Sequence, residues 1–406
     1  SPTDAIEQGI GMIHQHFMLV DTLTVAENVA LGLPSSRGPL TDLDRVTERI
    51  VELGKISGLE VDPDAYIWQL SVGEQQRVEI LKLLYRGAEV LILDEPTAVL
   101  TPQEAEEMAT TMRQMVDEGK SIIFITHKLD EVMAFADRVM VLRSGRVTAT
   151  LGIEGATKEH LAELMVGREV LFFLDKEPCK PGEAALEVDD LEALNDKGLP
   201  ALQGICLRVC QGEVLGIAGV AGNGQRELVE VIAGLRPATA GRVRVGGQDI
   251  TGYSPLGVIK ANVSHIPGDR LGVGMAPNLP VSDNLGLKAY REPPLARGPL
   301  LNGNALYRLS EQLIESFKIA TPGPETPARL LSGGNQQKAI VARELSRPIK
   351  LLIAAQPTRG VDVGSIEYIH SQLLEKRDEG VAVLLISVEL GEIMALSDRL
   401  AVGSAG

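Results

Sequence analysis

Short apolar runs alternate with amphipathic stretches along the chain, which is the pattern of an α/β protein. The run 90–93 is continuously apolar. It follows a predicted amphipathic helix, which begins after a polar turn near Ser71. A second apolar run, 122–125, follows a predicted helix with Pro102 in its first turn, where proline is tolerated. Continuous runs of this length are typical of parallel strands buried on both faces. We therefore predict buried strands between helices, with residues 21–69 mainly helical.

The chain repeats itself after a long interval. Ser71 returns as Ser332 and Asp137 returns as Asp398, an interval of 261 residues in both cases (71 to 332 and 137 to 398). A constant long interval indicates a duplicated domain and not a short solenoid repeat.

The duplication sets the expected domain bounds. We expect a first domain at 1–170 and a second at 186–406. Residues 171–185 lie between them, contain two prolines and mixed charge, and are predicted to form a linker.

Composition excludes several functions. The formal net charge of −16 argues against a nucleic-acid partner, because phosphate binding needs a basic face. No stretch approaches 18 uninterrupted apolar residues, and the chain shows no basic and apolar secretion signal. Three cysteines give no basis for a disulfide framework and fit a reducing cytoplasm. We therefore expect a cytoplasmic protein without membrane spans.

Chemically useful side chains end the predicted strands. Asp94 and Glu95 follow the run 90–93, and His127 follows shortly after the run 122–125. In open α/β sheets ligands bind outside the carboxyl ends of the strands. Two adjacent carboxylates there can supply a magnesium ligand and a base.

These motifs together resemble a known family. The stretches LSVGEQQ and LSGGNQQ, the apolar run that ends in Asp-Glu, and the pair Thr126-His127 resemble the nucleotide-binding domains of ABC transporters. The sequence of these motifs most resembles that of the tandem ATPase subunits of bacterial nucleoside and simple-sugar importers. The resemblance implies an α/β fold with two tandem P-loop NTPase domains, each with a mixed or parallel sheet and a helical subdomain. It implies ATP and Mg²⁺ as ligands, and two transmembrane permease subunits and, indirectly, an extracytoplasmic solute-binding protein as partners at the cytoplasmic face of the membrane.

The resemblance also implies roles for four residues of the first domain. Asp94 would bind Mg²⁺ and Glu95 would orient and deprotonate the attacking water. His127 would contact the γ-phosphate. Gln15, whose amide can both donate and accept, would reach the metal and the water.

Nucleotide-binding residues are expected mainly in the second domain. The resemblance identifies LSGGNQQ as an intact signature motif, LSVGEQQ as a substituted one, Asp362 as the aspartate of a D-loop, and the glycine-rich stretch from Gly219 as a phosphate loop. The expected nucleotide-binding residues of these motifs are Ser332, Gly333, Gly334, Asn335, Asp362, Gly219, Gly222, Asn223, Gly224, Gln225, Ser71 and Gly73. Glycines let backbone N–H groups point at phosphates. In the first signature Val72 replaces the usual glycine, and the carboxylate of Glu74 is an unlikely neighbour for a triphosphate.

The second domain lacks most of the catalytic side chains. Gln225 stands where the family has lysine, Ala355-Gln356 where the first domain has Asp-Glu, and Val388 where it has histidine. In the family each ATP lies between the phosphate loop of one domain and the signature of the other. When the motifs are paired in this way, the catalytic residues of the first domain and the intact signature of the second fall in one composite site, and the substituted motifs fall in the other. We therefore predict one hydrolytic site and one degenerate site.

Two other interpretations remain open. A soluble twin-ABC ATPase of translation or repair would share the repeat, although such proteins tend to carry a long charged linker. A non-catalytic nucleotide-binding scaffold is the second. No GxxGxGK[ST] phosphate loop precedes Gln15, so we expect these residues to be a fragment of a longer chain and inactive by themselves.

Overall fold

The computed structural model describes residues 1–14, 17–33, 42–97, 100, 102–143, 145–169, 176–219 and 222–403. Its contacts divide the chain into unit 1, residues 1–167, and unit 2, residues 168–406. Residue 170 and part of the predicted linker, 171–175, lie outside the described residues. The first strand of unit 2 begins at Ala184, so the last two residues of the range 171–185 are strand residues.

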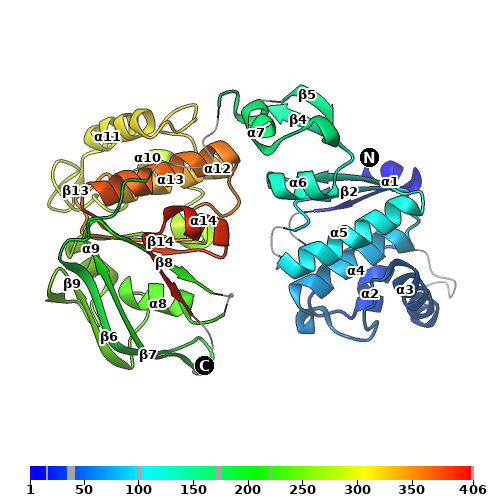
Figure 1. The fold of residues 1–406 in the computed structure, drawn as a ribbon, viewed down its shortest axis with the longest axis horizontal. Helices are drawn as coiled ribbons and strands as arrows, with labels where there is room; N and C mark the ends of the chain where they lie inside the picture. Colours follow the sequence, from blue (N-terminus) through cyan, green and yellow to red (C-terminus); the bar gives the residue numbers. More distant parts are fainter. Residues whose placement is uncertain are drawn as a thin grey trace. The chain divides into compact units, whose positions relative to one another are not determined.

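Unit 1 contains a parallel sheet of three described strands in the order β1-β2-β3 (Figure 1). These strands and an antiparallel hairpin span Ile10–Ile13 (β1), Val90–Asp94 (β2), Ser121–Ile125 (β3), Arg138–Arg143 (β4) and Arg146–Gly152 (β5). The α-helices span Pro2–Glu7 (α1), Val25–Ala30 (α2), Leu43–Ser57 (α3), Val72–Tyr85 (α4), Pro102–Asp117 (α5), Leu129–Phe135 (α6) and Lys158–Val166 (α7). Short 3-10 helices lie at Ile67–Gln69 and Ile153–Gly155.

Unit 2 contains a five-stranded parallel sheet in the order β11-β14-β15-β8-β16 and a four-stranded antiparallel sheet in the order β10-β9-β6-β7. The strands span Ala184–Leu194 (β6), Pro200–Cys210 (β7), Val214–Ala218 (β8), Ala240–Val245 (β9), Gln248–Asp249 (β10), Val263–Ile266 (β11), Ala296–Arg297 (β12), Leu300–Leu301 (β13), Leu351–Ala355 (β14), Ala382–Ile386 (β15) and Arg399–Val402 (β16). The helices span Gln225–Ile232 (α8), Pro255–Lys260 (α9), Val281–Gly286 (α10), Gly303–Ser316 (α11), Gly333–Leu345 (α12), Val363–Asp378 (α13) and Leu390–Leu396 (α14). Short helical turns lie at Arg270–Gly274 and Ala328–Leu330.

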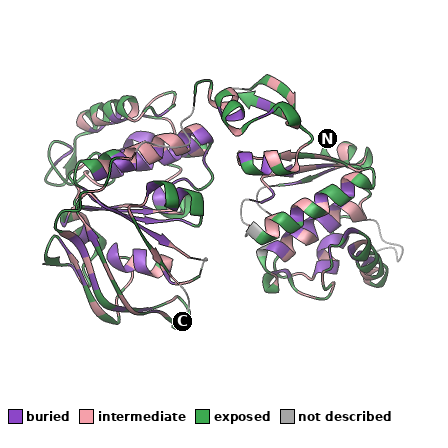
Figure 2. Cartoon of the chain, viewed as in Figure 1, coloured by how far each residue is buried: buried purple, intermediate pink, exposed green. Residues whose placement is uncertain are grey.

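In the parallel sheet of unit 2, most residues of β11, β14, β15 and β8 are buried (Figure 2), whereas the edge strand β16 is largely exposed. In β14, Leu351 and Ile353 pack with the antiparallel sheet and α8, whereas Leu352 and Ala354 pack with α12 and α13. Two apolar layers therefore hold the strand, as its continuous apolar run predicts. The predicted α/β fold is confirmed for both units.

The prediction that both apolar runs of unit 1 are fully buried is wrong. Leu91 and Leu93 of β2 are buried, but Ile123 and Ile125 of β3 are half exposed. The counterpart of β3 in unit 2 is β15, which lies between β14 and β8 under the second apolar layer. In the described part of unit 1, β3 pairs with β2 alone, and no second apolar layer covers its outer face.

Candidate functional site

The residue that follows β2 in unit 1 and the residue that follows β14 in unit 2 have the same backbone conformation. Glu95 follows β2 with a φ of 48°, and Gln356 follows β14 with a φ of 47°. Each donates its backbone N–H to the last residue of the neighbouring strand, Ile125 at 2.8 Å and Ile386 at 2.7 Å. A positive φ is uncommon for residues with a side chain, and such strained positions often occur at functional sites. The duplication has therefore kept the backbone of this strand end.

The side chains at this strand end differ between the units. In unit 1, Oε1 of Glu95 lies 2.8 Å from Nδ1 of His127, and both side chains are about four-fifths buried. Asp94 is the last residue of β2, directly before this pair. In unit 2, Oε1 of Gln356 accepts the backbone N–H of Val388 at 3.3 Å. Unit 1 thus pairs a carboxylate with an imidazole directly after Asp94, and unit 2 places an amide at this strand end.

A buried carboxylate that our sequence reasoning missed supports the ends of β2 and β3. Glu131 accepts a hydrogen bond from the hydroxyl of Thr97 through Oε1 and from that of Thr126 through Oε2, the latter at 2.9 Å. Nζ of Lys128 lies 3.5 Å from the same carboxylate. Thr97 follows Glu95 by two residues and Thr126 precedes His127. Glu131 therefore holds the two loops that carry Glu95 and His127.

A buried amide was also missed. Nε2 of Gln76, on α4, donates to the carbonyl oxygen of Pro96, next to Glu95. In unit 2, Nε2 of Gln337 donates to the carbonyl oxygen of Pro357 at 2.7 Å. The sequence did contain a signal, because glutamine 76/337 and glutamate 131/392 recur at the interval of 261 residues that relates the two signatures.

The intact signature forms the first turn of α12. Ser332 is the N-cap residue, and its Oγ accepts a hydrogen bond from Nδ2 of Asn335 at 2.9 Å. Asp362 caps α13 by accepting from the backbone N–H of Ser365 at 3.0 Å. A Cβ at Gly334 would lie 2.6 Å from Oδ2 of Asp362, so only glycine fits between the two helix starts. Gly333 lies between Ser332 and Gly334 in the first turn.

The first signature is capped differently. Oε2 of Glu74 accepts both the backbone N–H and the hydroxyl of Ser71, each at 2.8 Å, and these hydrogen bonds lower the pKa of Glu74. A Cβ at Gly73 would lie 2.6 Å from Oε1 of Glu104 on α5. The start of α4 therefore lies beside the carboxylates of Glu74 and Glu104, whereas the start of α12 has the amide of Asn335 and the carboxylate of Asp362.

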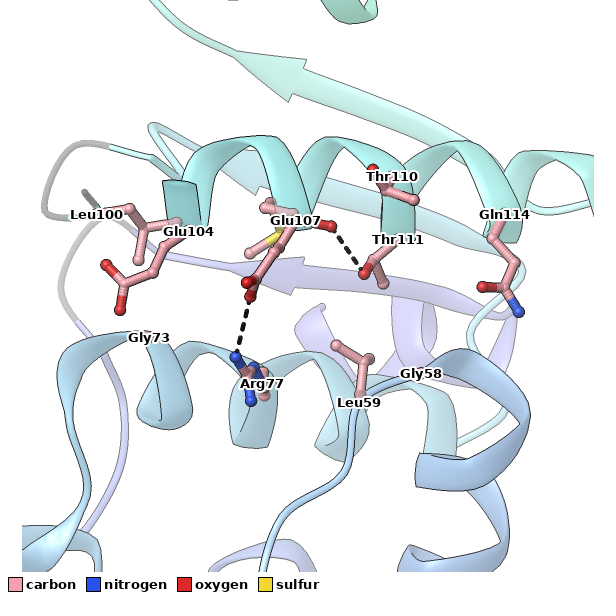
Figure 3. A pocket seen from close by; sticks show the side chains of 11 residues that line it. Gly58, Leu59, Gly73, Arg77, Leu100, Glu104, Glu107, Thr110, Thr111 and Gln114 are labelled. Atoms are coloured by element: carbon pink, nitrogen blue, oxygen red, sulfur yellow. Dashed lines mark hydrogen bonds and ion pairs between the residues drawn. The ribbon is translucent and has the colours of Figure 1, made fainter. Parts of the chain in front are cut away.

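A cavity of about 440 Å³ begins beside Gly73 and runs between α4 and α5 (Figure 3). An ion pair of 3.2 Å between Arg77 and Glu107 crosses it. Neither Glu95 nor His127 lines this cavity, so it is separate from the strand-end chemistry.

The glycine-rich loop before α8 has a conformation suited to phosphate. Gly222 and Gly224 have φ values of 99° and 82°, in the left-handed region that glycine adopts without strain. Nδ2 of Asn223 donates to the carbonyl oxygen of Gly403 at 3.3 Å. Nε2 of Gln225 is buried near Gly219 and has no hydrogen-bond partner among the described residues. The missing lysine is thus replaced by an amide directed towards the loop.

One predicted site residue lies outside the described residues, namely Gln15. Within the described part of the chain, no three His, Cys, Asp or Glu residues cluster closely enough to bind a metal by themselves. Mg²⁺ in nucleotide sites usually takes one or two carboxylates together with phosphate and water, and the Asp94 carboxylate at the end of β2 is chemically suited to that role. Among the described helices, none has the length and apolar character needed to cross a bilayer.

Relatives of this chain are found by sequence and by structure. The family model for "ABC transporter" matches residues 2–98 and 202–359. The nucleoside import ATP-binding protein NupA of Lactococcus lactis is 48% identical over 402 residues, which cover 99% of this chain and 79% of NupA. The glucose import ATP-binding protein TsgD13 of Haloferax volcanii is 48% identical over 432 aligned positions, covering 99% and 78%.

The fold is also found in a solved structure that matches almost the whole chain. The archaeal ribosome recycling factor aABCE1, in complex with the ribosomal stalk protein aP1, is 20% identical, with a TM-score of 0.62 over 98% of this chain and 73% of that one. This likeness concerns the fold alone. The family model and the relatives at 48% identity show that this chain belongs to the ABC transporter family, among its import ATP-binding proteins.

Proposed function

We propose that the chain hydrolyses ATP to energise the import of a nucleoside or a simple sugar, with one hydrolytic and one degenerate composite site. The observation that carries this proposal is the pair formed by Glu95 and His127 at 2.8 Å, set against Gln356 and Val388 at the same strand end of unit 2. The import names of the relatives at 48% identity supply the process and the substrate class.

Each catalytic residue acts by position and charge, as phosphoryl transfer requires. Glu95 orients the attacking water and takes its proton, and His127 holds the γ-phosphate. Asp94 and Gln15 are the residues that would bind Mg²⁺, which neutralises phosphate charge when it is bound. Glu131 and Gln76 keep these strand ends in place.

Signature and catalytic residues come from different units in the hydrolytic site. Ser332, Gly333, Gly334, Asn335 and Asp362 contribute the intact signature and D-loop to the site that contains Glu95. The degenerate site combines Ser71 and Gly73 with the loop Gly219, Gly222, Asn223, Gly224 and Gln225. That site holds nucleotide through backbone N–H groups and the Gln225 amide, and it turns nucleotide over poorly because it lacks a base.

An exposed apolar patch on unit 1 supports permease subunits as partners. Met18, Val20, Tyr66 and Trp68 are all exposed, with 66% of Met18 and 64% of Trp68 accessible. They are adjacent, because Trp68 donates its backbone N–H to Asp21 at 3.3 Å and the segments containing Thr24 and Tyr66 form a β-bridge. Exposed apolar groups of this kind often mark interaction sites. We assign this apolar patch to a permease at the cytoplasmic face of the membrane.

A role in translation or repair rests on the twin-cassette fold alone, since the recycling factor is 20% identical. The import proteins share 48% identity over almost the whole chain. We therefore favour transport over the soluble class, and the strand-end pair of unit 1 favours catalysis over a scaffold.

The test is Glu95→Gln in the full-length protein reconstituted with its permeases. The amide preserves size and removes the base, so single-turnover hydrolysis should fall by about 10²- to 10⁴-fold while ATP still binds. Glu107→Gln, which removes an exposed carboxylate of the same unit, should hydrolyse ATP normally. Uptake of labelled nucleosides and sugars by the wild-type complex identifies the substrate. Unchanged hydrolysis by Glu95→Gln would refute the assignment of the base.

A further inference from the structure

Helix α4 holds two loops of unit 1 through buried or partly buried polar side chains. Gln76 binds the carbonyl oxygen of Pro96 beside Glu95, as described above. One turn further along, Glu79 and Lys82 reach the segment around Met18. The helix that begins with the first signature therefore contacts both the catalytic strand end and the segment that carries part of the apolar patch.

The backbone of Met18, the carboxylate of Glu79 and the ammonium of Lys82 are all in contact with one another. Oε1 of Glu79 accepts the backbone N–H of Met18 at 2.7 Å, and Nζ of Lys82 donates to the carbonyl oxygen of Met18 at 3.1 Å. Nζ of Lys82 also lies 3.2 Å from Oε2 of Glu79. Glu79 is 3% exposed, and a buried carboxylate is costly unless it is paired in this way. We name these two side chains the Met18 clamp.

The Met18 clamp holds the backbone and leaves the side chain outside. Met18 is one of the most exposed apolar residues of the chain, in the apolar patch with Val20 and Trp68. Glu79 and Lys82 therefore connect the backbone of the patch to α4. Gln76 on the same helix binds the carbonyl oxygen of Pro96, the neighbour of Glu95.

Unit 2 lacks these two side chains at the corresponding positions. Ile340 stands in place of Glu79 and Arg343 in place of Lys82. Cδ1 of Ile340 lies 2.7 Å from the position of a Cβ at Gly274, and Nε of Arg343 is bound to Glu344 at 2.9 Å. An apolar contact thus replaces the polar clamp in the unit without catalytic carboxylates.

We propose that Glu79 and Lys82 are positioning residues that couple permease contact at the apolar patch to hydrolysis at Glu95. This inference rests on the proposed function. The Met18 clamp has no group at the reacting atoms, so its loss leaves basal chemistry in place and removes the response of hydrolysis to the permeases.

The experiment compares ATP hydrolysis by the full-length protein alone and reconstituted with its two permease subunits in proteoliposomes. Glu79→Ile installs the residue of unit 2, and Lys82→Met removes the ammonium. Both should lower permease stimulation by about tenfold and leave basal hydrolysis within about twofold of wild type. Glu79→Gln keeps an acceptor for Met18 and should recover most of the stimulation. Arg77→Met is the matched control, because it removes a cation from the same helix that pairs with Glu107 and not with a loop.

Two results would overturn the inference. One is normal stimulation of both Glu79→Ile and Lys82→Met, and the other is an equal loss of stimulation in Arg77→Met. If Glu79→Ile folds poorly, as thermal unfolding would reveal, Lys82→Met and Glu79→Gln decide the matter. Glu95→Gln runs in parallel: its inactivity together with normal stimulation of the clamp variants refutes the Met18 clamp alone, whereas its full activity refutes the proposed function.

Discussion

Replacement of Glu131 by alanine removes the carboxylate that joins the ends of β2 and β3. Hydrogen bonds to Thr97 and Thr126 are lost, together with the ion pair to Lys128. A hydrogen bond to a charged group contributes about 1.5–3 kcal/mol, and two hydroxyls lose their partner. Glu131 is 8% exposed, so water replaces little of the loss. We expect Glu131→Ala to lower the stability of this region by about 3 kcal/mol.

Unit 2 provides the control for this change. Glu392 is 7% exposed and accepts from the hydroxyl of Thr358 at 2.7 Å, with Nε2 of His370 at 2.9 Å from the same oxygen. Glu392→Ala should therefore cost a similar free energy. The strand end that it supports carries Gln356, which is no base, so hydrolysis should stay within about threefold of wild type. Glu131→Ala moves Glu95 and should lower hydrolysis by about 10²-fold, because misplacement by 1 Å can cost that much.

Two measurements check this pair of variants. Hydrogen exchange of residues 90–94 and 351–355 in the full-length protein reports the local stability of each strand, and single-turnover ATP hydrolysis reports the chemistry. Glu131→Gln should recover most of the activity, since an amide can accept from one hydroxyl and donate to the other. Equal loss of hydrolysis in Glu131→Ala and Glu392→Ala would refute the reasoning, as would normal hydrolysis in a destabilised Glu131→Ala.

Three further predictions concern the two signatures, Gln356 and the buried His265. Ser332→Arg puts bulk and charge into the intact signature and should abolish hydrolysis, whereas Ser71→Arg should weaken nucleotide-driven closure and leave measurable turnover in the same assay. Gln356→Glu should leave the hydrolysis rate unchanged, because Ala355 still provides no metal ligand. Burial lowers the pKa of His265 from 6.5 to about 4, so unfolded unit 2 binds more protons between these values. Its stability to urea should be complete above about pH 6.5 and fall as the pH drops towards 4, and His265→Phe should flatten this dependence.

The fold could be predicted from the sequence because local pattern and global repeat agree. The apolar run 90–93 forms β2, the capped stretch after Ser71 forms α4, and Pro102 begins α5. The burial of β3 could not be predicted, because it depends on the layers around a strand and not on its own residues. An apolar run therefore predicts that a strand can be buried and leaves open what covers it.

The reacting groups of the candidate site could be predicted from the sequence, but the buried residues that support them could not. Glu95 and His127 follow two neighbouring strands, and the structure places Oε1 of Glu95 2.8 Å from Nδ1 of His127. Glu131 and Gln76 were missed because a lone glutamate or glutamine on a helix usually faces solvent. Their recurrence at the interval of 261 residues was the available signal, because two exposed positions have no physical reason to keep the same polar residue in both units.

The two units differ at the reacting groups and agree in the support behind them. Unit 2 has Gln356 and Val388 in place of Glu95 and His127, yet its strand end keeps the positive φ. It also keeps the buried glutamine and glutamate that bind the following loop, although both are costly to bury without partners. A unit needed only as inert packing could replace these groups by apolar residues. Their presence implies that unit 2 still requires a fixed strand end for a purpose other than chemistry at Gln356.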